Sequence, residues 1–167
     1  MRKNIILILV VASLVIINLS IMKKEKVLES GEQVYIKLAP RDPRSLIQGD
    51  YMVLRYLIPQ TLNKKQKEIP RKGFLVLLLN EKKVGVIKRL YKPGEKLATE
   101  ERLIQYRVRS RGIRIGAESF FFQEGHRKPY EVARYGELRL TKNGHSVLVG
   151  LRNDQLIKII PKKAASQ

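Results

Sequence analysis

FLVLLLNEKKVGVIKRLY, residues 74–91, is the stretch that sets the fold class of this chain. The apolar runs at 74–79 and 84–91 flank the polar residues NEKK. Two apolar runs of strand length around a short polar segment are typical of a β-hairpin. The stretch therefore predicts two neighbouring antiparallel strands in the middle of the chain.

The same kind of pattern recurs on both sides of this hairpin. Toward the C-terminus, ELRL at 137–140 and HSVLVGL at 145–151 flank Asn143-Gly144, a dipeptide that favours tight hairpin turns. Apolar alternation predicts further strands at 34–38, 51–58, 104–110 and 113–115, and short helices are expected at 63–69 and 129–135. Many short strands joined by turns predict a mainly β domain, barrel-like or sandwich-like, with one or two short helices.

The N-terminal run NIILILVVASLVIINLSIM, residues 4–22, carries no charged side chain. About 20 apolar residues at about 1.5 Å per residue cross a hydrocarbon core of roughly 30 Å. We therefore predict a membrane anchor over residues 1–26, one β domain over residues 27–160 and a frayed tail over 161–167. A cleaved signal peptide is the alternative, but the run exceeds the usual apolar region of about 7–15 residues and lacks a small-residue cleavage site.

Basic residues stand on both sides of this anchor, with Arg2 and Lys3 before it and Lys23, Lys24 and Lys26 after it. The positive-inside rule is therefore nearly balanced. The short N-terminal tail favours translocation of the chain after residue 27. The expected location is the bacterial inner membrane, with a single span and the domain facing the periplasm or the cell exterior.

The charge is strongly basic: 34 Lys plus Arg stand against 15 Asp plus Glu, a net charge of +19. Such a balance attracts polyanions, and for a tethered domain the nearest are lipid headgroups and envelope polymers. The densest basic clusters are Lys64, Lys65, Lys67, Arg71 and Lys72, then Arg107, Arg109, Arg111 and Arg114. A basic solvated face is the alternative to a functional anionic contact. Nucleic acid is not expected as a partner, since no recognised binding motif is present.

Cysteine is absent, and His126 and His145 are the only histidines. A disulfide, a thiolate metal site and a His-rich metal centre are therefore excluded. No residue pattern indicates a cofactor, and none is expected.

A sharper signal is GDYMVLRY at residues 49–56, which follows PRDPR at 40–44 after four residues. It resembles the defining motif of the GDYXXLXY family, and every fixed position of that motif is filled, by Gly49, Asp50, Tyr51, Leu54 and Tyr56. The resemblance extends to ESFFFQEG at 118–125, ARYGELRL at 133–140 and VLVGL at 147–151. It implies a bacterial membrane-anchored protein with a domain outside the cytoplasm, and it carries no established activity.

The matching segments supply the candidate binding or structural site: Arg41, Asp42, Arg44, Gly49, Asp50, Tyr51, Leu54, Tyr56 and Glu124. A proline-stiffened loop carries Arg41 and Arg44, and either guanidinium can donate charge-assisted hydrogen bonds to the Asp50 carboxylate. We interpret Asp50 as a structural clamp, with ligand binding or catalysis as the alternative. Tyr51 and Tyr56 are expected on opposite faces of one strand, one of them in the core with its hydroxyl bonded.

Phe120, Phe121 and Phe122 form an aromatic run. Successive side chains of a strand point to opposite faces, so three consecutive rings cannot share one face. We expect core packing on both sides of an irregular strand, with a peptide-binding groove as the alternative.

A second resemblance, at the level of the scaffold, is to type I signal peptidases. VIKRLYKPGE at 86–95 resembles their lysine segment and places Lys88 at the general-base position. Arg41-Asp42 stand where the nucleophilic Ser-Met of that family should be, so Lys88 has no serine to deprotonate. The resemblance therefore implies a shared scaffold rather than a shared reaction.

The sequence as a whole predicts an envelope module, more a binding protein than an enzyme. Residues 4–22 contact membrane lipid, and the domain binds a membrane-protein partner or an anionic envelope component. A signal-peptidase-like hydrolase using Lys88, or an inactive relative of one, is the alternative function.

Overall fold

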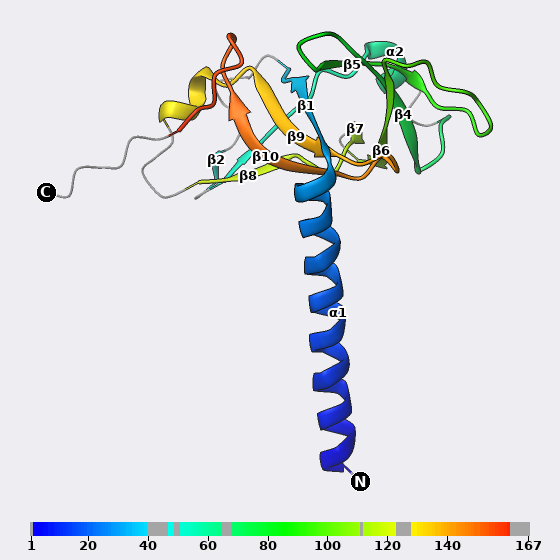
Figure 1. Ribbon diagram of the computed structural model, residues 1–167, viewed down its shortest axis with the longest axis vertical. Coiled ribbons are helices and arrows are strands. Elements are labelled where there is room, and N and C mark those ends of the chain that lie inside the picture. Colours follow the sequence, from blue (N-terminus) through cyan, green and yellow to red (C-terminus); the bar gives the residue numbers. More distant parts are fainter. Residues whose placement is uncertain are drawn as a thin grey trace, which may run out of the picture.

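The computed structural model describes residues 2–39, 47–48, 51–64, 68–110, 112–122 and 128–160. A long helix, α1 (Arg2–Ser30), projects from a β domain as a stem (Figure 1). Two short helices belong to the domain, α2 (Gln60–Lys64) and the 3-10 helix η1 (Lys128–Val132). The predicted fold class, mainly β with an N-terminal helix and one or two short helices, is confirmed. However, α2 begins at Gln60 rather than at residue 63, because the Pro59 carbonyl already accepts from the N–H groups of Leu62 and Asn63.

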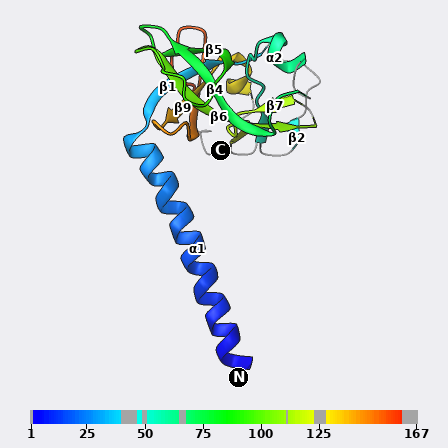
Figure 2. The same cartoon turned by 90° about the vertical axis from the view of Figure 1, so that its right-hand side faces the viewer.

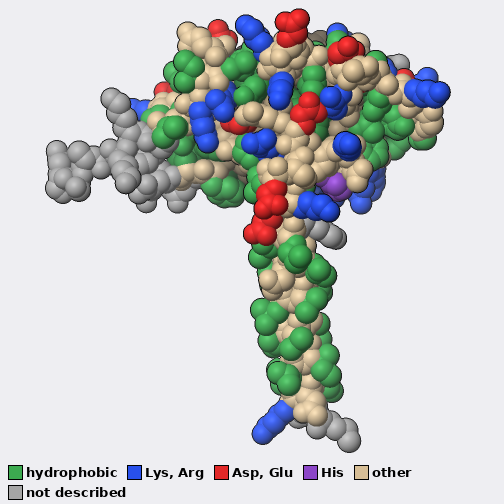
Figure 3. All heavy atoms as spheres, viewed as in Figure 1, with side chains coloured by type: hydrophobic (Ala, Val, Ile, Leu, Met, Phe, Trp, Pro, Cys, Tyr) green, Lys and Arg blue, Asp and Glu red, His purple; other side chains and the backbone are tan. Residues whose placement is uncertain are grey.

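The middle of α1 presents apolar side chains to its surroundings on all sides, and Figure 3 shows it as a green and tan column. Its polar side chains bond within the helix: Ser13, Asn18 and Ser20 each donate to the carbonyl four residues earlier, at 2.8–2.9 Å. A helix that satisfies its own polar groups is compatible with a hydrocarbon environment. In the described part of the chain, α1 is the one helix that is long and apolar enough to cross a membrane.

A seven-stranded sheet carries the core, in the order β10-β9-β1-β5-β4-β6-β7. The strands are β1 (Glu32–Lys37), β4 (Lys72–Leu79), β5 (Val84–Leu90), β6 (Glu101–Arg109), β7 (Gly112–Arg114), β9 (Tyr135–Leu140) and β10 (Ser146–Arg152). All neighbours are antiparallel except β1 and β5. Both predicted hairpins are present, as β4–β5 and β9–β10.

The sheet curls into half a barrel, and its two ends approach each other (Figures 1 and 2). The Gln105 N–H in β6 donates to the Gly144 carbonyl, in the turn between β9 and β10, at 2.9 Å. Close by, the Ser146 hydroxyl donates to the Ile115 carbonyl at 3.4 Å. Strands from opposite ends of the sheet order therefore meet along a seam, as the barrel-like alternative of the prediction requires.

A smaller sheet of three strands lies beside this seam: β2 (Ile47–Gln48), β3 (Tyr51–Val53) and β8 (Ser119–Phe121), in the order β2-β3-β8. The prediction of one strand over residues 51–58 is wrong. The ladder of β3 ends at Val53, and the Leu54 N–H instead donates to the Glu118 carbonyl at 2.6 Å. Tyr56 pairs with Leu38 in an isolated bridge.

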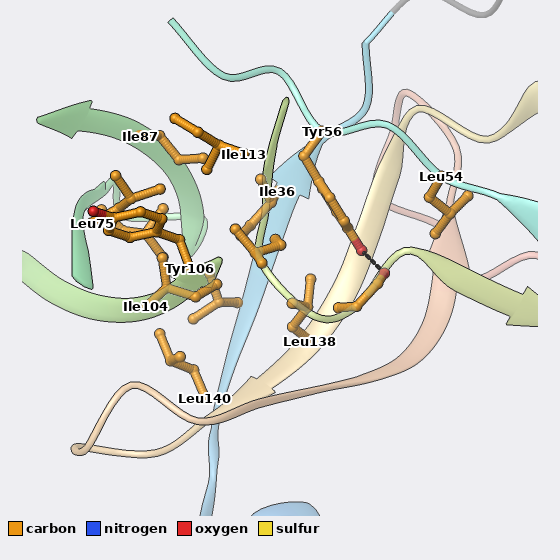
Figure 4. Packing of buried hydrophobic residues seen from close by; sticks show 14 of the residues in the cluster. Ile36, Leu54, Tyr56, Leu75, Ile87, Ile104, Tyr106, Ile113, Leu138 and Leu140 are labelled. Carbon is orange, nitrogen blue, oxygen red and sulfur yellow. Dashed lines mark hydrogen bonds between the residues drawn. The ribbon is translucent and has the colours of Figure 1, made fainter. Parts of the chain in front are cut away.

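The core fills the concave side of the curled sheet, and Figure 4 shows its packing. Its largest fully buried side chains come from six strands: Tyr106, Ile36, Leu75, Leu77, Ile87, Ile104, Leu138 and Leu151. Ile104, Tyr106 and Val108 of β6 face this core, so Arg107 and Arg109, which alternate with them, face outward. The same alternation leaves the side chains of Arg107 and Arg109 exposed.

Gly31 joins α1 to β1 without a linker. Its N–H donates to the Val27 carbonyl at 3.0 Å, and its own carbonyl accepts from Arg139 of β9 at 3.3 Å. A Cβ at this position would collide with the Val27 carbonyl oxygen and would lie 3.0 Å from the Arg139 Cβ. The absence of a side chain therefore allows the end of α1 to lie directly against the sheet.

Candidate functional site

The second half of the GDYMVLRY segment is a structural lock. The Tyr56 hydroxyl donates to the Ala117 carbonyl at 2.6 Å, beside the backbone bond between Leu54 and Glu118 (Figure 4). Leu54 and Tyr56 are both buried, and burial raises the pKa of the Tyr56 hydroxyl far above its ordinary value. These two residues therefore fix residues 117–118 to the core.

Gly136 in β9 makes room for this lock. A Cβ there would lie 2.9 Å from the Tyr56 ring and 3.0 Å from its hydroxyl oxygen. The expectation that one tyrosine of the motif packs in the core with a bonded hydroxyl is confirmed for Tyr56. The expectation that Tyr51 and Tyr56 share one strand is wrong, since the chain leaves the ladder between them.

Most of the predicted site falls outside the described residues, namely Arg41, Asp42, Arg44, Gly49, Asp50 and Glu124. The Asp50 clamp therefore stays a prediction. Of the motif positions that are described, Leu54 and Tyr56 contact residues 117–118, and Tyr51 lies on the outer side of β3.

The phenylalanine run divides differently from the prediction. Phe120 and Phe122 pack against Tyr130, with ring centroids 4.9 and 5.5 Å apart. Phe121 is 72% exposed, so the expectation of core packing for all three rings is wrong for this one. It lies against Tyr51 of β3 instead, at 5.7 Å between centroids, because the two residues pair across the small sheet.

A pocket of about 490 Å³ opens at the seam of the half-barrel, and three arginines line it. We call it the arginine pocket and define it by Arg107, Arg109 and Arg114. Arg107 and Arg109 project from the outer face of β6, and Arg114 pairs directly with Arg107 across the β6–β7 ladder. Of the basic cluster found in the sequence, Arg107 and Arg109 thus lie on one face of β6, Arg114 lies beside them on β7, and Arg111 lies outside the described part.

The guanidiniums of the arginine pocket lack acidic partners within the described residues. No ion pair or hydrogen bond joins Arg107, Arg109 or Arg114 to a described carboxylate. Glu118 also lines the pocket, but its Oε1 accepts from the N–H groups of Ile115 and Gly116, at 2.6 and 3.2 Å. Like charges opposite each other on a ladder repel, so an anion between Arg107 and Arg114 would relieve an unfavourable contact.

Lys88 of β5 is exposed and lies where the β4–β5 ladder changes register. None of the described hydroxyl groups hydrogen-bonds to its ammonium. Arg41 and Asp42, which stand at the nucleophile position of the signal-peptidase pattern, are outside the described part, so the hydrolase alternative stays a prediction. Within the described residues no group of His, Asp or Glu is arranged to hold a metal ion.

One buried charged cluster was not anticipated from the sequence. Glu137 of β9 is 5% exposed, accepts from Arg152 at 2.8 Å and also accepts from Gln33. Burial alone would raise the pKa of Glu137, but the hydrogen bonds from Arg152 and Gln33 hold it below its ordinary value. Alternation with the buried Leu138 places Glu137 on the other face of β9, where Arg152 and Gln33 both hydrogen-bond to it. The Arg152 guanidinium also lies over the Tyr35 ring, 5.5 Å from its centroid.

Comparison with known proteins finds one matching family. The family model described as GDYXXLXY protein matches residues 13–151, which include α1 from its middle onward and nearly the whole β domain. No curated protein and no solved structure matches the chain.

Proposed function

Because the chain belongs to the GDYXXLXY protein family, we propose that it is a single-pass membrane protein whose β domain binds an anionic component of the bacterial cell envelope through the arginine pocket. The domain faces the periplasm or the cell exterior. In this proposal the protein acts by binding, and catalysis has no part in it.

The observation that carries this proposal is the grouping of Arg107, Arg109 and Arg114 around one pocket without an acidic partner among the described residues. Guanidiniums form bidentate, charge-assisted hydrogen bonds with phosphates and carboxylates. Three other arginines of the domain are paired with carboxylates: Arg89 contacts Glu95 at 2.7 Å, Arg102 contacts Glu32 at 2.7 Å and Arg152 contacts Glu137 at 2.8 Å. The pocket groups three arginines that have no such partner among the described residues, and in this proposal a ligand supplies the negative charge.

The anchor supports the membrane part of the proposal. The apolar run at 4–22 extends about 28 Å as a helix, close to a hydrocarbon core of roughly 30 Å. A reporter active only in the periplasm, fused after Gln167, should be active in cells. Activity solely from a cytoplasmic reporter at the same position would contradict the proposed orientation.

Binding is tested with full-length protein in neutral detergent micelles and two soluble polyanions, inorganic polyphosphate and polyglutamate. Replacing Arg107, Arg109 and Arg114 together with Gln should weaken binding of polyphosphate at least tenfold. The matched control replaces Lys82, Lys92 and Lys96 with Gln, which removes the same charge from exposed turns away from the pocket. The control should change binding by less than about twofold, apart from the general salt dependence of surface charge.

Equal weakening by both triple variants would contradict the proposal, because it would mean that the basic surface acts only as a diffuse field. Tighter binding of polyglutamate than of polyphosphate would point instead to an acidic segment of a membrane-protein partner. An enzyme using Lys88 has no supporting contact among the described residues.

A further inference from the structure

We infer that the arginine pocket takes the phosphate of a lipid headgroup from the same membrane that α1 crosses, while the neighbouring pair Tyr51–Phe121 lies in the lipid–water interface. This inference rests on the proposed function and names its ligand. The side of the domain that carries the pocket and the pair is then a membrane-docking face.

The first support is an exposed aromatic pair beside the pocket. Tyr51 and Phe121 are cross-strand partners on the outer side of the small sheet, and Phe121 is 72% exposed. Val53, two residues along β3 on the same side and 39% exposed, lines the arginine pocket itself. Apolar and cationic surfaces are therefore continuous here. Aromatic rings next to basic side chains match the chemistry of the membrane interface, where rings lie at the headgroup level and cations contact phosphates.

The second support is the position of the pocket relative to α1. His145 and Ser146 line the pocket, and they follow the turn after Leu140 of β9. Leu140 pairs with Glu32, which stands directly after the junction at Gly31. The pocket therefore opens at the end of the domain where the helix enters. In Figure 1, β8 and β2 of the small sheet lie on the lower side of the domain, from which α1 leaves.

The third support is the short distance between the domain and the lipid phosphates, which the length of α1 sets. After the apolar run ends at residue 22, α1 continues to Ser30, which adds about 12 Å at about 1.5 Å per residue. The headgroup layer occupies roughly 5–8 Å of that length on each side of the bilayer. With no linker at Gly31, the domain is held within about one Debye length, roughly 8 Å, of the lipid phosphates.

The test uses the absence of tryptophan from the chain, because Phe121→Trp then carries the sole tryptophan fluorophore. The full-length variant is placed in nanodiscs of either phosphatidylcholine or an equal mixture with phosphatidylglycerol, each with and without brominated acyl chains. Docking predicts that bromine quenches the tryptophan at least twofold more in the anionic discs than in the neutral discs. Tyr51→Trp, on the neighbouring strand, should give the same result and guards against misfolding of one variant.

The matched control is Val86→Trp. Val86 is 54% exposed on β5, which lies on the side of the domain away from α1 in Figures 1 and 2. Its fluorescence should be unaffected by brominated lipid in either disc. Adding Arg107→Gln and Arg114→Gln to Phe121→Trp should lower quenching in anionic discs to the neutral level, if the arginines are what recognise the phosphate.

Three results would overturn the inference. The first is no quenching at residue 121 in anionic discs, the second is equal quenching in neutral and anionic discs, and the third is quenching that survives loss of the two arginines. If any of these occurs while the triple arginine variant still loses polyphosphate binding in micelles, the proposed anion site stands and only its assignment to lipid fails. If polyphosphate binding is also insensitive to the arginines, the proposed function fails as well.

Discussion

Two arginine environments lie on opposite ends of the same curled sheet, and they differ in where the charge is compensated. Arg152 of β10 is compensated inside the protein: its guanidinium bonds to Glu137 at 2.8 Å and to the Leu156 carbonyl at 3.1 Å. Arg107, Arg109 and Arg114 are grouped around an open pocket without a described carboxylate. The ion pair of Arg152 with Glu137 contributes to the stability of the fold. The three arginines of the pocket are open to a ligand.

The largest expected effect is on the free energy of unfolding, which should fall when the buried partner of Arg152 is left unpaired. Arg152→Ala leaves the Glu137 carboxylate buried with Gln33 as its remaining hydrogen-bond donor, and breaking one partner of a buried pair costs about 3–5 kcal/mol. Unfolding of the full-length protein in micelles, followed by the near-ultraviolet circular dichroism of the tyrosines, measures the loss. The control Arg102→Ala breaks an exposed pair with Glu32 and should cost about 0–1 kcal/mol. Similar losses in both variants would remove the distinction between inner and outer arginines.

The pH dependence of the stability tests the same ion pair of Arg152 with Glu137. The pKa of Glu137 is lower in the folded protein than in the unfolded chain, so the unfolded state binds the proton more readily. Its contribution to stability is therefore fully present above the unfolded pKa of about 4.3 and is lost as the pH falls through the folded pKa. Glu137→Gln should flatten the acid limb of a stability–pH curve, and an unchanged acid limb would contradict the pairing.

A smaller effect is expected at the tyrosine lock. Tyr56→Phe removes the donor to the Ala117 carbonyl and leaves a buried acceptor unpaired, at a cost of about 1–3 kcal/mol. Tyr51→Phe, on the exposed side of β3, should cost less than about 0.5 kcal/mol. Denaturant titration of both variants would show whether the two tyrosines of the motif divide into a structural and a surface role, as their positions indicate.

The smallest effect on stability is expected in the arginine pocket. Arg107→Gln removes the like-charge contact with Arg114, which should leave the domain unchanged or stabilise it by about 0.2–1 kcal/mol. The same variant should weaken binding of polyphosphate. A loss of stability as large as that of Arg152→Ala would mean that Arg107 supports the fold, and would contradict its assignment to a ligand site.

The strands were predictable from the sequence because their apolar alternation matches the burial that the fold provides. FLVLLL and VGVIKRLY form β4 and β5, and the Asn143-Gly144 turn joins β9 to β10. The outward placement of Arg107 and Arg109 follows from the same alternation. Alternation does not tell which strands are neighbours, so the pairing of Arg114 with Arg107 and the presence of His145 in the same pocket could not be derived from the sequence.

Two wrong predictions and one buried carboxylate that was not anticipated have the same physical origin, which is that contacts distant in sequence override the local pattern. Tyr56 leaves the strand pattern because its hydroxyl reaches Ala117. Phe121 is exposed because its partner on the small sheet is Tyr51 rather than a core residue. Glu137 is buried because Arg152 covers it from a strand that follows a register shift near Gly150. Each of these depends on the register between strands, which single-sequence periodicity does not determine.

At Gly31 the helix α1 is joined to the half-barrel without a linker, so the two elements are expected to move together. Transmembrane helices tilt by about 20° on average, and they tilt further when the bilayer is thinner than their apolar length. The Gly31 carbonyl accepts from Arg139 of β9, so a tilt of α1 in a bilayer would be passed on to the domain. Bilayer thickness would then set the inclination of the domain, and a thinner membrane would bring one rim of the half-barrel down to the surface while lifting the other.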